Sequence, residues 1–126
     1  MNRPIKFRVW DFFHKQWITG AAIELNGCII NTSFAEPETN CVALQYTGLT
    51  DINDNPIYEG YILKISYGTM GDVIGQVLYE ADHGGYIFQW KRIRKGRGQD
   101  YKNLNCDVAF ESVIVGNIFE NPELLK

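Results

Sequence analysis

Apolar and polar residues alternate in short segments along the chain, and glycine or proline separates these segments at close intervals. Most segments have the length of a β-strand, and several are rich in β-branched residues. We expect strands at 6–11, 18–25, 28–30, 41–49, 61–67, 71–81, 86–90 and 110–119. The pattern therefore predicts a mainly β fold.

Local signals add detail to three of these segments. The dipeptide Asn26–Gly27 predicts a hairpin between the second and third segments. In the first segment, Phe7 and Val9 alternate with basic residues, which predicts one packed and one exposed face. Gly75, inside a strand pattern, indicates either a bulge or a close approach of another main chain.

The C-terminal segment has a helical pattern. Asn121 suits an N-cap and Pro122 the first helical position, so we expect one short helical turn there. A weaker helix is expected at 100–104. Together these elements predict a single domain over residues 1–126. Its expected architecture is a small, strongly bent, SH3-like β-barrel with an N-terminal β-meander and the short C-terminal turn.

Composition narrows the functional classes. The chain has 126 residues, of which 45% are hydrophobic and 21% charged, as in an ordered domain. Its 12 Lys+Arg and 15 Asp+Glu residues leave a net charge of -3, so nucleic acid could bind only at a local basic patch. The sequence has neither an apolar run long enough to cross a membrane nor the apolar centre of a signal peptide. We therefore expect a cytoplasmic protein without membrane contact.

Residues that could carry metal or catalytic chemistry show no characteristic spacing. Cys28, Cys41 and Cys106 are odd in number and widely separated, so we expect reduced, buried thiols rather than disulfides or a zinc site. His14 and His83 each lie beside turn residues. With no nucleophile next to a base and no phosphate-binding glycine motif, the sequence predicts no enzyme activity, no metal and no cofactor.

The stretch DINDNPIYEG, residues 51–60, begins like a calcium loop. Asp51, Asn53 and Asn55 have the spacing of the first three ligands of an EF-hand. The sixth and twelfth positions, however, are Pro56 and Ile62 instead of glycine and glutamate. The stretch is therefore interpreted as a turn in which the Asp51 and Asn53 side chains bind main-chain N–H groups and Pro56 leads into the next strand. Gly60 is expected to form a bulge or tight bend at the entrance of that strand.

With its flanks, this turn resembles the YopX family, small proteins encoded mainly by temperate bacteriophages and prophages. The most specific matches are Gln45–Leu49 with Asp51, Ile57–Gly60, Gly116–Ile118 and Glu120–Leu125. The resemblance covers the start, middle and end of the chain, and it implies a mainly β fold and a phage or prophage origin. It implies no reaction and no catalytic residues. The chain departs from the family at Tyr61, where an acidic residue is usual.

Three residues beside the turn are candidates for a binding surface: Tyr46, Tyr58 and Glu59. Two hydroxyls and a carboxylate around one turn could contact a partner. In the alternative interpretation, the tyrosines form a core pair, and the glutamate is solvated or bonded to main chain.

The strongest local binding signal is a basic segment. Half of the basic residues lie there, namely Lys91, Arg92, Arg94, Lys95, Arg97 and Lys102. Trp90 and Tyr101 flank these residues and could stack on nucleic-acid bases. The segment could instead bind an acidic protein, or it could be a solvated hairpin whose charges keep an edge strand from pairing with other chains.

The sequence thus predicts a non-enzymatic phage or prophage accessory protein of the bacterial cytoplasm. It is expected to bind a host or phage protein, with the basic segment as its contact. The alternative is a nucleic-acid-binding module that uses the same segment, 91–102. Homo-oligomerisation is compatible with the many aromatic residues.

Overall fold

The computed structural model describes residues 6–12, 14–18, 21–23, 29–31, 36–37, 41–91 and 99–126. Most of this part of the chain is in β-strands, which confirms the mainly β fold. The strands are β1 (Phe7–Asp11), β2 (Gln16–Ile18), β3 (Ala21–Ile23), β4 (Ile29–Asn31), β5 (Glu36–Pro37), β6 (Cys41–Thr50), β7 (Pro56–Tyr58), β8 (Tyr61–Ser66), β9 (Asp72–Glu80), β10 (Gly85–Lys91), β11 (Gln99–Asn103) and β12 (Ser112–Asn117). The helical elements are α1 (Cys106–Phe110) and the 3₁₀ turns η1 (Gly68–Met70), η2 (Ala81–His83) and η3 (Pro122–Leu125).

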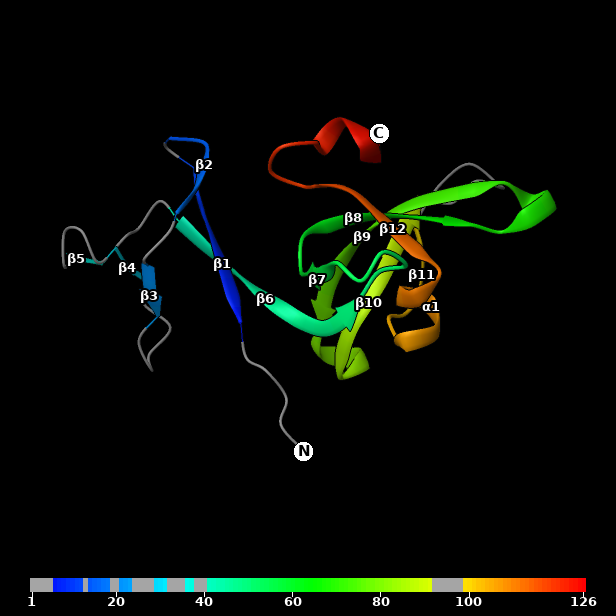
Figure 1. Cartoon of the computed structure of the whole chain (residues 1–126), viewed down its shortest axis with the longest axis horizontal. Coiled ribbons are helices and arrows are strands. Elements are labelled where there is room, and N and C mark those ends of the chain that lie inside the picture. Colours follow the sequence, from blue (N-terminus) through cyan, green and yellow to red (C-terminus); the bar gives the residue numbers. More distant parts are fainter. Residues whose placement is uncertain are drawn as a thin grey trace.

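The described strands form sheets of five, four and three strands. The five-stranded sheet has the order β11-β10-β9-β8-β12 and is bent, and its end strands do not pair within the described residues, so it forms a half-barrel. The four-stranded sheet, β2-β1-β6-β7, lies beside the half-barrel, and the long strand β6 reaches from one to the other (Figure 1). Strands β3, β4 and β5 form a small antiparallel meander.

The main hydrophobic core is enclosed by the half-barrel, β6 and α1. Strand β8 lies at its centre and is buried on both faces, since Ile62 and Leu63 are each 0% exposed. Helix α1 contributes the buried Val108, and its N-cap Asn105 accepts a hydrogen bond of 2.9 Å from the main-chain N–H of that residue. Burial of a side chain of this size contributes about 1.5–3 kcal/mol. The core therefore joins elements from both halves of the sequence.

Gly75 on β9 lies where two main chains approach closely, one of the two alternatives that the sequence left open. A Cβ atom at this position would overlap the main-chain oxygen of Gln89 on β10. The pairing of β9 with its neighbours continues without a register shift through Gly75. A side chain is thus excluded by the tight packing of β9 against β10.

Two expectations about element boundaries are wrong. Segment 100–104 is largely strand β11 rather than a weak helix, because its main chain pairs with β10. The segment expected as one strand at 18–25 includes parts of two strands, because Ile18 belongs to β2, which pairs with β1, and Ala21–Ile23 form β3, which pairs with β4. Residues 19, 20, 24 and 25 lie outside the described residues. The antiparallel pairing expected on either side of Asn26–Gly27 is confirmed, because β3 pairs with β4. The turn itself, at 24–28, lies outside the described residues.

Burial also differs from the pattern expected for two segments. Val9 and Trp10 on β1 are each 5% exposed although they point to opposite faces, while Phe7 is 44% exposed. The face expected to be wet is covered because Trp10 packs against Phe119. Cys106 is exposed rather than buried, since it begins α1 at the surface.

The C-terminal helical turn is confirmed as η3, which follows Asn121 and has proline in its first turn. The Asn121 side chain does not cap it, because its Oδ1 accepts a hydrogen bond of 3.2 Å from the main-chain N–H of Asn117 instead. In the described part of the chain, no helix is long and apolar enough to span a bilayer.

Candidate functional site

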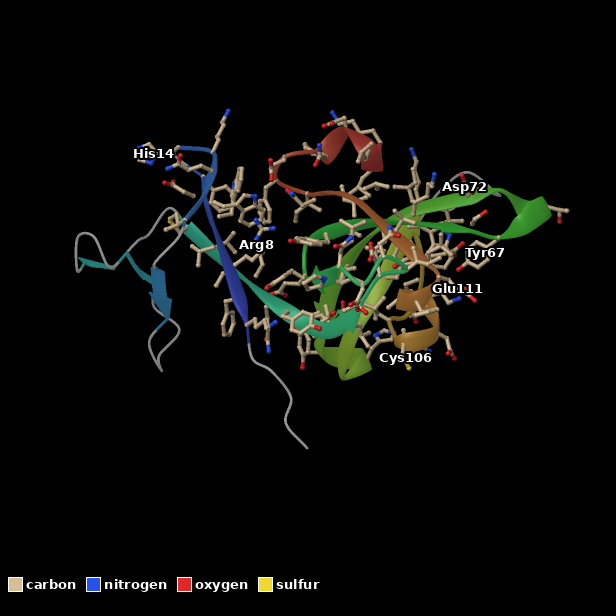
Figure 2. The ribbon with its side chains drawn as sticks, viewed as in Figure 1. Arg8, His14, Tyr67, Asp72, Cys106 and Glu111 are labelled. Carbon is tan, nitrogen blue, oxygen red and sulfur yellow. The ribbon has the colours of Figure 1, made fainter. Side chains whose placement is uncertain are left out.

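Aromatic and basic side chains join the four-stranded sheet to the half-barrel. The Arg8 guanidinium lies 3.8 Å from the centre of the Trp17 ring, and it donates a hydrogen bond to the Tyr61 hydroxyl on β8. Figure 2 shows Arg8 between the two sheets. Lys6 lies 5.3 Å from the centre of the Tyr46 ring. The positive charges of this segment are thus placed against aromatic faces, an arrangement that favours both partners.

A second group of contacts connects the same sheet to the C-terminal segment. The indole N–H of Trp17 donates to the Glu120 carboxylate at 2.8 Å. The rings of Trp10 and Phe119 are stacked, with their centres 5.8 Å apart. These contacts hold residues 117–120 beside the four-stranded sheet.

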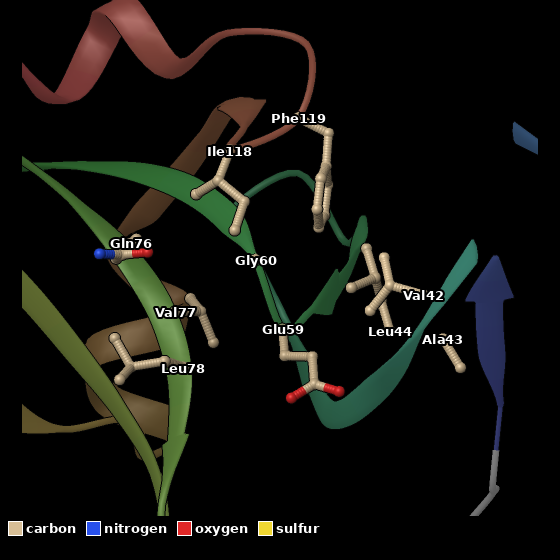
Figure 3. A pocket seen from close by; sticks show the side chains of 10 residues that line it. All are labelled: Val42, Ala43, Leu44, Glu59, Gly60, Gln76, Val77, Leu78, Ile118 and Phe119. Carbon is tan, nitrogen blue, oxygen red and sulfur yellow. The ribbon is translucent and has the colours of Figure 1, made fainter. Parts of the chain in front are cut away.

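A pocket of about 230 Å³ lies between β6 of the four-stranded sheet and β9 of the half-barrel (Figure 3). Its walls come from β6, the turn before β8, β9 and the segment after β12. The lining residues are Val42, Ala43, Leu44, Glu59, Gly60, Gln76, Val77, Leu78, Ile118 and Phe119. We call this the inter-sheet pocket. Its walls are largely apolar, and Glu59 is the ionisable residue among them.

Gly60 keeps one wall of the inter-sheet pocket free of side-chain atoms. Its φ of +83° is unfavourable for residues with a side chain, and a Cβ atom there would lie 3.3 Å from the Phe119 ring and 3.6 Å from Ile118. The main-chain N–H of Gly60 donates to the Val77 carbonyl at 2.7 Å, and the Gly60 carbonyl accepts from the main-chain N–H of Ile118 at 2.8 Å. This glycine therefore shapes the pocket and ties three of its walls together.

The three candidate residues beside the turn have different environments. Tyr46 and Tyr58 are 8% and 9% exposed, and their rings pack with centres 5.6 Å apart. Both tyrosines thus belong to the core rather than to a surface. Burial raises the pKa of the Tyr58 hydroxyl above its ordinary value of 10.0, and the neighbouring Tyr61 adds to this effect. Glu59 is half-buried and lines the inter-sheet pocket.

The turn at 51–55 has the structure expected from its sequence. The Asp51 side chain is 1% exposed, and its Oδ1 accepts hydrogen bonds of 2.9 Å from the main-chain N–H groups of Asn53 and Asn55. Its Oδ2 accepts from Ile114 on β12 at 3.1 Å. Strand β7 then begins at Pro56. Asp51 therefore binds main chain on two sides, as a turn residue does.

The structure describes only part of the basic segment. Arg92, Arg94, Lys95 and Arg97 lie outside the described residues. Of the described members, Lys91 is exposed, whereas the half-buried Lys102 donates from Nζ to the Tyr67 hydroxyl at 3.2 Å.

The two aromatic residues that flank the basic segment lie on opposite faces of the sheet. Trp90 pairs with Asp100 across β10 and β11, so the adjacent Tyr101 points the other way. Trp90 is half-buried against Phe88, with ring centres 5.4 Å apart, while Tyr101 is 51% exposed. The two rings therefore cannot stack on one nucleic-acid strand along the same face.

The ionisable residues show little clustering outside this region. In the ranges that the structure describes, no group of three or more His, Cys, Asp or Glu residues could hold a metal ion. His14 and the buried Asp11 form a pair, with Nδ1 and Oδ2 2.6 Å apart. His83 packs edge-on against Tyr101, with ring centres 4.6 Å apart.

The fold and the site define a mainly β protein with a half-barrel, an adjoining sheet and a small apolar pocket between them. The chain belongs to the YopX family, because the family model described as YopX protein matches residues 6–126. It is also similar to the crystal structure of protein EF1440 from Enterococcus faecalis. That likeness has a TM-score of 0.67 and 23% identity, covers 99% of this chain and 100% of the other, and supports the fold. A comparison with curated proteins gave no match.

Proposed function

We propose that the protein is a non-enzymatic phage or prophage accessory protein that binds a host or phage protein in the bacterial cytoplasm. The observation that carries this proposal is the position of the inter-sheet pocket. Glu59 and Gly60, from the family motif at Ile57–Gly60, form part of its lining, and Ile118 comes from the motif at Gly116–Ile118. Three of the ten lining residues thus belong to the motifs by which the chain resembles the family.

The size of the pocket favours a partner's side chain over a free small molecule. Sites for drug-sized ligands and cofactors usually have volumes of about 300–1,000 Å³. The inter-sheet pocket, at about 230 Å³, is smaller than this range. Protein interfaces commonly place one anchoring side chain in a pocket of this kind and surround it with weaker contacts. We therefore propose that the pocket holds one side chain of a protein partner.

Two further observations lead us to place the contact with the partner protein at the inter-sheet pocket rather than at the basic segment 91–102. The opposite orientations of Trp90 and Tyr101 speak against a shared stacking surface for nucleic acid. The net charge of -3 also opposes the approach of a polyanion to the molecule as a whole. The nucleic-acid alternative predicts binding of labelled DNA or RNA at low salt, and loss of that binding as salt is raised.

An affinity experiment with pocket variants tests the proposal. Tagged protein would be used to capture partners from bacterial cells that carry the phage or prophage. The variant Ile118→Phe places a larger, aromatic side chain in the pocket wall. Ile74→Phe makes the same change on the exposed side of β9, outside the pocket. A partner captured by the wild type and by Ile74→Phe should be lost with Ile118→Phe.

Equal capture by all three proteins would contradict the proposed site. Thermal unfolding of each variant distinguishes a blocked pocket from an unfolded one. Should Ile118→Phe unfold, Leu78→Phe offers a second change in the wall of the same pocket.

A further inference from the structure

We infer that the inter-sheet pocket takes a basic side chain, a lysine or arginine of the partner, and that Glu59 selects for it. The aliphatic stem of that side chain would lie along the apolar walls, and its charged end would meet the Glu59 carboxylate. This inference rests on the proposed function, since it names the chemistry of the partner at the same pocket.

The first observation is the state of the Glu59 carboxylate. One of its oxygens, Oε1, accepts a hydrogen bond of 3.0 Å from the main-chain N–H of Gln45, which fixes the side chain in place. The main-chain N–H of Glu59 in turn donates to the Gln45 carbonyl at 3.0 Å. No cationic side chain of the described residues forms an ion pair with this carboxylate. A half-buried negative charge is therefore oriented by a main-chain hydrogen bond beside an apolar space, without a positive partner among the described residues.

The second observation is that the nearby cations are already engaged. Arg8 lies against the Trp17 ring and donates to Tyr61, and Lys6 lies over the Tyr46 ring. These contacts keep the positive charges of the N-terminal strand on aromatic faces rather than on Glu59. The carboxylate is thus left for a cation from outside the described chain.

The third observation is the arrangement of the pocket. In Figure 3, Glu59 and the Phe119 ring lie at opposite sides of the space, with Val42 and Leu44 on one flank and Val77 on the other. The Glu59 carboxylate is directed away from the Phe119 ring, at the rim of the pocket. Lysine and arginine side chains bury their methylene stems on apolar surface and keep the charged end at a polar site. An almost wholly apolar lining with the Glu59 carboxylate at its rim matches that shape and polarity.

Other side chains fit the pocket less well. An acidic side chain would meet the negative charge of Glu59. A purely apolar side chain would fill the space but would cover the carboxylate and remove water from it without supplying a hydrogen-bond donor, which is costly. A basic side chain avoids both penalties. Because Glu59 remains partly exposed, we expect its charge to add a modest factor, about five-fold in affinity, rather than several powers of ten.

A ligand series with one six-carbon chain tests the inference directly. Hexylamine, hexanol and hexanoate would be titrated into the ¹⁵N-labelled full chain at pH 7, with the main-chain amides of Gly60, Val77 and Ile118 followed by NMR. We expect saturable shifts at these amides. Hexylammonium should have a Kd about five-fold lower than hexanol, and hexanoate should bind most weakly.

The variant Glu59→Gln provides the decisive comparison. Glutamine keeps an oxygen that can accept the Gln45 N–H but carries no charge, so the local main-chain contact is retained. The preference for hexylammonium over hexanol should disappear in Glu59→Gln and persist in Glu80→Gln, a half-buried glutamate outside the pocket lining. If Glu59→Gln failed to fold, the order of the three Kd values for the wild type would still show whether the pocket prefers a cationic ligand.

The possible failures are distinguishable. Equal binding of all three ligands at the pocket amides would overturn the role of Glu59 while leaving an apolar anchoring pocket intact. Absence of any saturable shift at those amides would overturn this inference altogether. The proposed function fails separately, when a captured partner is indifferent to Ile118→Phe.

Discussion

Replacing Asp51 with asparagine should destabilise the protein, because its two carboxylate oxygens bind separate parts of the chain. Oδ1 accepts from the main-chain N–H groups of Asn53 and Asn55, each at 2.9 Å, and Oδ2 accepts from that of Ile114 at 3.1 Å. An asparagine has one carbonyl oxygen and one amide nitrogen. If the oxygen keeps the turn contacts, the nitrogen must face the N–H of Ile114, and two donors then oppose each other.

The magnitude follows from where these donors lie. Asn53 and Asn55 are exposed, so their N–H groups can bind water if the turn loosens, and their contacts should cost little to lose. Ile114 is half-buried on β12, and its N–H is harder to hydrate. A hydrogen bond to a charged acceptor contributes about 1.5–3 kcal/mol. We therefore expect Asp51→Asn to lower the free energy of unfolding by about 2 kcal/mol, or Tm by roughly 8 °C.

Urea unfolding followed by circular dichroism at pH 7 would measure this change. The matched control is Asp54→Asn, in the same turn. Asp54 is exposed and has a φ of +64°, a conformation that asparagine accepts, so its replacement should change the stability by less than about 0.5 kcal/mol. A loss for Asp51→Asn no larger than that of the control would refute the assigned role of the buried carboxylate.

Three further predictions concern packing, pH and the contact between the sheets. Gly75→Ala should cost about 3 kcal/mol or more in urea unfolding, because its Cβ would overlap main chain of β10, whereas Gly85→Ala, with nothing within 4 Å of the added Cβ, should be nearly neutral. The raised pKa of Tyr58 means that the folded state holds this proton more tightly than the unfolded chain, so stability should fall as pH rises above about 10. In Tyr58→Phe, the difference in unfolding free energy between pH 8 and pH 11 should be smaller, and an unchanged difference would contradict this cause. Trp17→Phe should lose about 1 kcal/mol in urea unfolding, because it removes the indole N–H donated to the C-terminal segment, and an unchanged stability would contradict that contact.

Local features of the sequence were sufficient where short-range chemistry decides the structure. The turn at Asp51 followed from side-chain hydrogen bonds to main chain and the proline that comes after it. The position of η3 followed from Pro122 after Asn121, although the Asn121 side chain accepts from Asn117 rather than capping the turn. Strand β11 was missed because the polar sequence QDYKN has no apolar alternation, and its conformation comes from pairing with β10. Such pairing is a tertiary effect, which local propensity does not contain.

The inter-sheet pocket could not be predicted for a related reason. Its walls come from four separate parts of the chain, at 42–44, 59–60, 76–78 and 118–119, and strand register decides which side chains meet. The sequence did indicate Glu59, but it grouped this residue with two tyrosines that the fold buries. The sequence also indicated a tight bend at Gly60, and the structure shows a positive φ there. The proximity of Gly60 to Phe119 depends on how separate segments assemble, so local sequence does not contain it.

Three polar residues of the family motifs, Asp51, Asn117 and Glu59, differ in how far the fold itself requires their side chains. Asp51 binds the main chain of β12, and Asn117 accepts main-chain hydrogen bonds of 3.0 and 2.8 Å from Phe119 and Glu120. Folding accounts for both of these side chains. Glu59 is different, because a neutral glutamine could accept the same N–H from Gln45, so the main-chain contact does not require a negative charge. The fold does not need this charge at the edge of an apolar pocket, but a cationic group of a partner would. For this reason we propose that the inter-sheet pocket is the binding site.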